Sequence, residues 1–75
     1  MRNEIIAQSA RFRALRTSRD RVRIKRADSK VEVGSLKRCR EFGGWEFVAE
    51  PEYRCQDLVT FAEAATRAVL RLEAA

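Results

Sequence analysis

Residues 21–26, RVRIKR, alternate strictly between cationic and apolar side chains. Successive side chains of a β-strand point to opposite faces of a sheet, so Val22 and Ile24 share the face opposite the cations. The apolar face of such a strand must be covered by a second layer before it is stable. We therefore expect a sheet with one solvated face and one covered face.

Residues 60–75 predict the helix that covers this sheet. Thr60 and Glu63 form a capping box, in which a hydroxyl at the start of a helix and a carboxylate three residues later satisfy free backbone N–H groups. The helix should begin at about Phe61, and Leu70 should point away from the sheet. The apolar side of the helix consists mainly of small residues, which allow close packing, and it comprises Phe61, Ala64, Ala65, Ala68, Val69 and Leu72.

Two further strands are expected between the alternating segment and the helix. Residues 31–42 resume the alternation with Val31 and Val33, and Gly34 indicates a bulge. The two glycines at 43–44 favour a tight turn, after which Trp45, Phe47 and Ala49 share one face of another strand. Together with residues 21–26, these segments predict a three-stranded antiparallel meander.

The N-terminal segment is compatible with a helix from about Glu4 to Arg16, although its apolar residues spread around most of the circumference. Such a helix needs contacts on more than one side, which a homodimer formed through it would supply. We therefore predict an α+β fold with the order α-β-β-β-α: an N-terminal helix, the meander, and a C-terminal helix packed on the sheet. With 75 residues, the chain forms one small basic domain spanning residues 1–75.

This expected order of elements resembles the double-stranded RNA-binding domain, and the alanine-rich stretch AEAATRAVLRL is similar to the second helix of that family. The family places a cluster of lysines at the start of its second helix. This chain instead carries Cys55, Gln56 and Asp57 before the helix and Glu63 in its first turn. The resemblance therefore covers the order of elements but not the phosphate-binding residues, and we do not assign the family.

The residue types available make an enzyme a poor expectation. The chain contains no histidine, which is the most common general base, and no nucleophile elbow, phosphate loop or paired-carboxylate motif. Cys39 and Cys55 lack the further ligands that a zinc site needs, so we predict free thiols, no metal and no cofactor. The lack of a long apolar run favours a cytoplasmic protein without a membrane partner.

The charge distribution carries the functional prediction. Residues 1–40 contain thirteen Arg or Lys and four acids, and residues 11–26 alone contain eight cations against one acid. If residues 4–16 are helical, Arg2, Arg13 and Arg16 could extend the cationic surface. We predict a binding surface on the alternating strand and the strand after it, formed by Arg19, Arg21, Arg23, Lys25, Arg26, Lys37, Arg38 and Arg40.

Two functions fit this surface. The first is a small nucleic-acid-binding protein that contacts the phosphates of DNA or RNA through the Arg-rich strand and hairpin. The second is a phage-type regulator or inhibitor, similar to anti-CRISPR proteins, whose arginines dock on an acidic host protein or occupy its nucleic-acid channel. The outward face of any strand must also be polar, so solubility alone is a third explanation of part of the charge.

Overall fold

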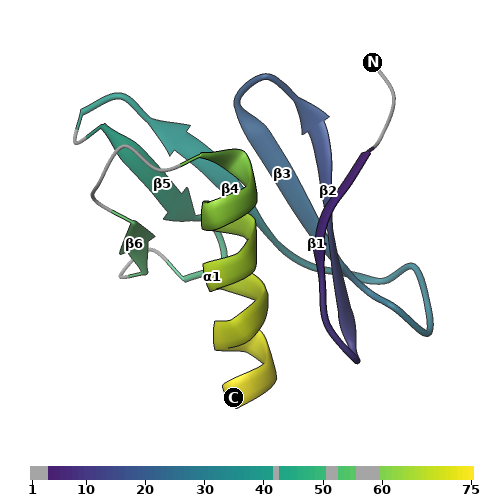
Figure 1. Cartoon of the computed structure of the whole chain (residues 1–75). Coiled ribbons are helices and arrows are strands. Elements are labelled where there is room, and N and C mark those ends of the chain that lie inside the picture. Colours follow the sequence, from purple (N-terminus) through teal and green to yellow (C-terminus); the bar gives the residue numbers. More distant parts are fainter. Residues whose placement is uncertain (1–3, 42, 51–52, 56–59) are drawn as a thin grey trace.

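The structure is a computed structural model that describes residues 4–41, 43–50, 53–55 and 60–75. It shows one six-stranded antiparallel sheet and one helix (Figure 1). The strands lie in the sheet in the order in which they occur in the chain, so each pairs with its neighbours in sequence. The elements are β1 (Glu4–Gln8), β2 (Phe12–Ser18), β3 (Arg21–Arg26), β4 (Glu32–Cys39), β5 (Gly44–Phe47), β6 (Arg54–Cys55) and α1 (Phe61–Ala74).

The predicted N-terminal helix is wrong, and with it the α-β-β-β-α order and the count of three strands. Residues 4–18 form the hairpin of β1 and β2, in which Ile5 pairs with Leu15 and Ala7 with Ala14. Phe12 and Ala14 are buried while Arg13 between them is exposed, which is the two-residue period of a strand. The resemblance to the double-stranded RNA-binding domain depended on that helix and is lost, as is the reason for expecting a homodimer formed through it.

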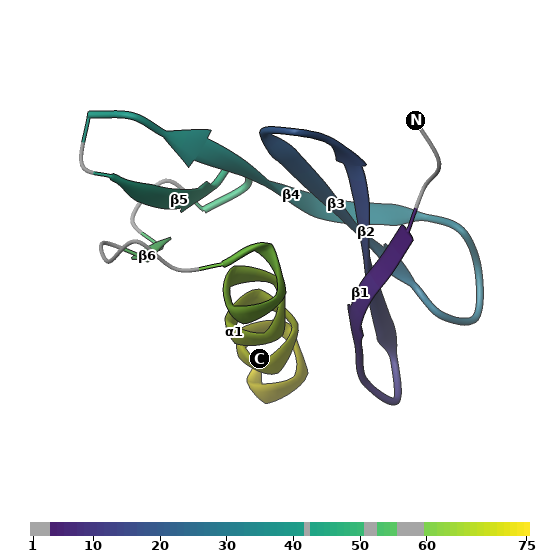
Figure 2. The ribbon, with the colours of Figure 1, turned by 45° about the horizontal axis from the view of Figure 1, so that its top comes forward.

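The sheet curves around α1. In Figures 1 and 2 the strands at both ends of the sheet bend toward the helix, so the face that meets α1 is concave and the opposite face is convex. The concave face and the helix enclose the core. Its fully buried members with the largest side chains are Trp45, Ile24, Leu36 and Val22. The strand predicted for residues 21–26 and the shared face of Trp45 and Phe47 are confirmed. The placement of Ala49 on that face is wrong, because β5 ends at Phe47 and Ala49 is exposed.

The helix begins where the capping box predicts. The backbone N–H of Glu63 donates to the Oγ1 of Thr60 at 3.1 Å, and the first helical residue is Phe61. Ala64, Ala65, Ala68 and Val69 are buried, and Phe61 and Leu72 pack beside them as predicted. Leu70 is 61% exposed, as expected for a residue on the opposite side. Small side chains on the covered side allow α1 to lie close to the sheet.

A close contact fixes the middle of the concave face. The bulge predicted at Gly34 lies beside it: Ile24 pairs with Gly34, Lys25 pairs with Glu32, and Val33 is the extra residue. A Cβ atom at position 34 would lie 2.9 Å from Cε1 of Phe47 and closer still to Cζ. The glycine therefore leaves the space that the ring of Phe47 occupies.

A polar cluster fastens the β1–β2 turn to the last turn of α1. The Glu73 carboxylate accepts hydrogen bonds from the hydroxyl of Ser9, from the backbone N–H of Arg11 at 2.8 Å and from its Nε at 2.8 Å. The guanidinium of Arg11 also donates to the backbone carbonyl of Glu73 at 3.1 Å. These contacts span more than sixty residues of chain and hold the hairpin against the helix.

Substituting Gly34 should destabilise the fold. In Gly34→Ala the new methyl group overlaps the ring of Phe47, and overpacking of this kind costs about 1–3 kcal/mol. Urea unfolding should show the loss, and Ser29→Ala, at an exposed turn position, should not. Phe47→Leu removes the ring that the new methyl group overlaps. In the Phe47→Leu background, Gly34→Ala should therefore cost less unfolding free energy than it does in the native protein. An equal cost in both backgrounds would show that the ring is not the obstacle.

Acid should remove the stability that Glu73 contributes. The hydrogen bond from Ser9, followed by those from Arg11, lowers the pKa of Glu73 to about 2 from its usual 4.5. Because the folded pKa lies below the unfolded one, the stabilisation is complete above pH 4.5 and is lost as the pH falls toward 2. The free energy of unfolding should therefore fall more steeply with acid in the native protein than in Glu73→Gln.

The matched control for this pH series is Glu4→Gln, which removes a carboxylate at the exposed end of β1. This variant should retain the acid dependence of the native protein. Identical acid profiles for the native protein and Glu73→Gln would contradict the assignment.

Candidate nucleic-acid interface

The register of the sheet gathers cations from three strands on the convex face. Arg13 of β2 pairs with Lys25 of β3, and Arg21 of β3 pairs with Lys37 of β4. Residues directly opposite each other in an antiparallel pair point to the same face, and Arg23 lies between Arg21 and Lys25 in the same phase. We call this set the convex cation face: Arg13, Arg21, Arg23, Lys25 and Lys37.

Most of these cations have no counter-ion. Arg23 forms an ion pair with Glu32 at 3.2 Å, and both side chains are about half exposed, so the pair is weak. The other four members form no ion pair with any part of the chain that the structure describes. Glu46 lies directly opposite Lys37 on β5 and forms its ion pair with Arg54 at 3.2 Å, so this pair adds no net charge. The convex cation face thus carries four more positive charges than negative ones.

Four of the eight predicted binding residues lie elsewhere. Arg19 lies in the β2–β3 turn and Arg40 follows the end of β4, so neither belongs to a strand. Arg26, at the end of β3, donates to Asp28 at 3.1 Å. Arg38 pairs in register with Trp45 and therefore points to the concave side. The structure brings together the other four, which are Arg21, Arg23, Lys25 and Lys37.

The sequence prediction missed Arg13 as a strand residue of this face. The signal was present, because the segment RFRA at residues 11–14 alternates cations with apolar residues in the same way as residues 21–26. The assumption of an N-terminal helix concealed it. Arg2, the other N-terminal candidate for the surface, lies outside the described residues.

A shallow hollow lies at one end of the convex face. Its volume is about 400 Å³, and its apolar part comes from Ile5 and Leu15, which are opposite each other on β1 and β2. Four cations line it against one acid, Asp28, which Arg26 neutralises. The unpaired cations at the hollow are Arg13, Lys25 and Lys30. The positive potential of the convex face should therefore be strongest here.

The arginines on the concave side have a different role. The guanidinium carbon of Arg16 lies 3.8 Å from the centre of the Phe61 ring, and that of Arg38 lies 5.8 Å from the same centre. Arg38 also lies over the ring of Trp45 at 5.5 Å. These stacks close the core at the start of α1, because a guanidinium covers an aromatic face while its edge remains hydrated.

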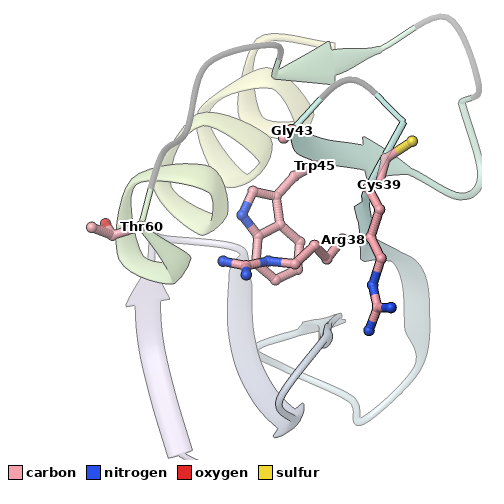
Figure 3. A pocket seen from close by; sticks show the side chains of 7 residues that line it. Arg38, Cys39, Gly43, Trp45 and Thr60 are labelled. Atoms are coloured by element: carbon pink, nitrogen blue, oxygen red, sulfur yellow. The ribbon is translucent and has the colours of Figure 1, made fainter.

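Beside these stacks lies a cavity of about 440 Å³ (Figure 3). It is lined by Arg38, Cys39, Arg40, Gly43, Gly44, Trp45 and Thr60. In the figure the Arg38 side chain extends along the indole of Trp45, while Thr60 lies on the opposite side at the helix start. The lining pairs no nucleophile with a general base, and no cluster of potential metal ligands occurs among the described residues.

Of the two thiols, that of Cys55 is buried and that of Cys39 is partly exposed. Cys55 is buried in the core, and its Sγ donates to the hydroxyl of Tyr53 at 3.6 Å. Burial, followed by this contact, raises the pKa of Tyr53, so the phenol stays protonated at neutral pH. Cys39 and Cys55 are both free thiols.

Comparisons with protein-family models, with curated proteins and with solved structures found no match for this chain. Within the described residues, no helix is long and apolar enough to cross a membrane. The functional conclusion therefore depends on the site itself.

The stacking role of Arg16 can be separated from its charge. Arg16→Lys keeps the positive charge but loses the planar group that lies on Phe61, which should cost about 0.5–1 kcal/mol of unfolding free energy. Arg13→Lys is the matched control, because Arg13 is on the same strand and faces solvent on the convex side. In chemical denaturation only the first variant should be destabilised. Equal effects at the two positions would mean that the stack contributes nothing.

Proposed function

We propose that this protein binds nucleic acid through the phosphates, with the convex cation face as its contact surface. The observation that carries the proposal is the set of unpaired cations that three neighbouring strands present on one solvated face. Solubility requires charges of both signs dispersed over a surface, whereas these charges have one sign and gather on one face. Such a surface attracts a polyanion.

The dimensions of the face suit several phosphates at once. Arg21, Arg23 and Lys25 follow one another along β3 at intervals of about 6.7 Å, given a rise near 3.3 Å per residue. Arg13 and Lys37 flank this row on strands that are about 4.8 Å to either side. The cations therefore cover an area of roughly 13 by 10 Å, over which a nucleic-acid backbone carries a series of negative charges.

An acidic protein surface is the second ligand that could use the same cations, as in a phage-type regulator. We rank it below nucleic acid because aromatic anchors dominate protein interfaces, and the aromatic residues that the structure describes are in the core or half-buried. We place the activity in the cytoplasm, since both described cysteines are free thiols and thiols persist in a reducing compartment.

Removing charge from the convex face should weaken binding and reduce its salt dependence. We would replace Arg13, Arg21 and Lys25 by Gln and measure fluorescence anisotropy with a labelled 24-mer duplex over a series of salt concentrations. If four cations each neutralise one phosphate, the logarithm of the affinity of the native protein falls by about 3.6 per tenfold rise in salt. The triple variant should lose about 2.7 of that slope.

The matched control replaces three exposed arginines outside the convex cation face, which are Arg19, Arg40 and Arg67. Its net charge equals that of the triple variant, but its slope should stay close to that of the native protein. Equal losses in both variants would show a general effect of net charge and would refute a defined site. Absence of binding at low salt would refute the function and leave the face to an acidic protein.

A further inference from the structure

We infer that the ligand of the convex cation face is a double-stranded nucleic acid, bound through its phosphates without reading its bases. This inference rests on the proposed function and specifies its substrate. It follows from where the aromatic residues lie, from the curvature and rigidity of the face, and from the way its cations are held.

The aromatic side chains are on the wrong side for a single strand. Proteins that bind single strands stack the bases on exposed aromatic rings set among cations. Here every described aromatic residue packs on the concave side: Phe12, Trp45, Phe47, Tyr53 and Phe61. The ring of Tyr53 is half-buried between Phe47, at 6.1 Å between ring centres, and the guanidinium of Arg71. As far as the described residues define it, the surface that carries the free cations therefore offers phosphate contacts without base stacking.

The shape of the face also favours a rigid partner. The strands curve away from the convex side, as Figure 2 shows, so a flexible strand lying on it would not be enclosed. The strands that carry these cations are paired with one another, and the opposite face of β3 holds Val22 and Ile24, both fully buried. The spacing of the cations is therefore set by the sheet. A duplex presents a dense and regular series of phosphate charges, about one negative charge per 1.7 Å of helix axis, to these regularly spaced cations.

The cations are not held in orientations that recognise a base. Bidentate recognition of a base edge needs a side chain fixed by packing and by further hydrogen bonds. Among the described residues, Arg13 and Arg21 have no hydrogen-bond partner for their guanidinium groups, and only Arg23 is held, by Glu32. Cations without a fixed partner can contact phosphates, which carry no sequence information.

The hollow beside Ile5 is a place on this face where an apolar lining could receive a base. Its volume of about 400 Å³ and the apolar side chains of Ile5 and Leu15 could accept an unstacked base between Arg13 and Lys25. Because Ile5 is on the edge strand and is 48% exposed, it can be replaced without opening the core. Ile5→Ser therefore distinguishes phosphate contact from base insertion.

The experiment compares anisotropy titrations of the native protein with two 24-mer duplexes of unrelated sequence and with each of their separated strands. At one salt concentration, both duplexes should bind with equal affinity, and the single strands should bind about tenfold more weakly because no stacking compensates for their flexibility. Ile5→Ser should bind the duplexes with the affinity of the native protein. Its circular dichroism spectrum and unfolding curve establish that the sheet is intact.

Three outcomes would overturn the inference while leaving nucleic-acid binding in place. These are single strands that bind as tightly as duplexes, a preference for one duplex sequence over the other, and a loss of affinity in folded Ile5→Ser. Failure of every strand and duplex to bind at low salt would instead refute the proposed function. The titrations are repeated with RNA duplexes and RNA single strands, to tell whether RNA or DNA binds more tightly. For the nucleic acid that binds more tightly, the duplex should bind more tightly than its separated strands.

Discussion

The rest of this structure depends on the contact between the alanine-rich side of α1 and the concave face of the sheet. Ala64 and Ala65 are fully buried, and the lack of bulk at these positions allows the helix to lie inside the curve of the strands. On the sheet, the absence of a side chain at Gly34 allows the ring of Phe47 to lie over the backbone. A short chain with one helix can cover only one face of its sheet, so the other face is left to solvent.

This asymmetry divides the arginines into two groups with different physical roles. On the concave side, Arg16 and Arg38 lie on the rings of Phe61 and Trp45, where the planar guanidinium acts as an amphipathic cover for the core. On the convex side, Arg13 and Arg21 lie among other unpaired cations, where their charge dominates. The same residue type thus stabilises the fold on one face of a strand and creates a positive potential on the other.

Local patterns predicted the elements whose signals are complete within a few residues. The start of α1 was predicted because Thr60 and Glu63 satisfy backbone groups of the first turn, and this needs no distant contact. The strand at residues 21–26 was predicted because its alternation is unbroken. The N-terminal hairpin was missed because a bulge lies between Ile5 and Ala7 and interrupts the two-residue period, leaving apolar residues that also suit a helix.

The sequence by itself determined that this chain has a capped helix with one apolar side, an alternating strand with one cationic side, and an excess of positive charge in its first forty residues. Only the tertiary structure decided which cations act together, because strand pairing sets which side chains share a face. Arg13 and Lys25 are twelve positions apart yet lie opposite each other, whereas Lys37 and Arg38 are adjacent and point to opposite sides of the sheet. Neighbours along a strand diverge and partners across strands converge, so the surface could be located only once the register was known.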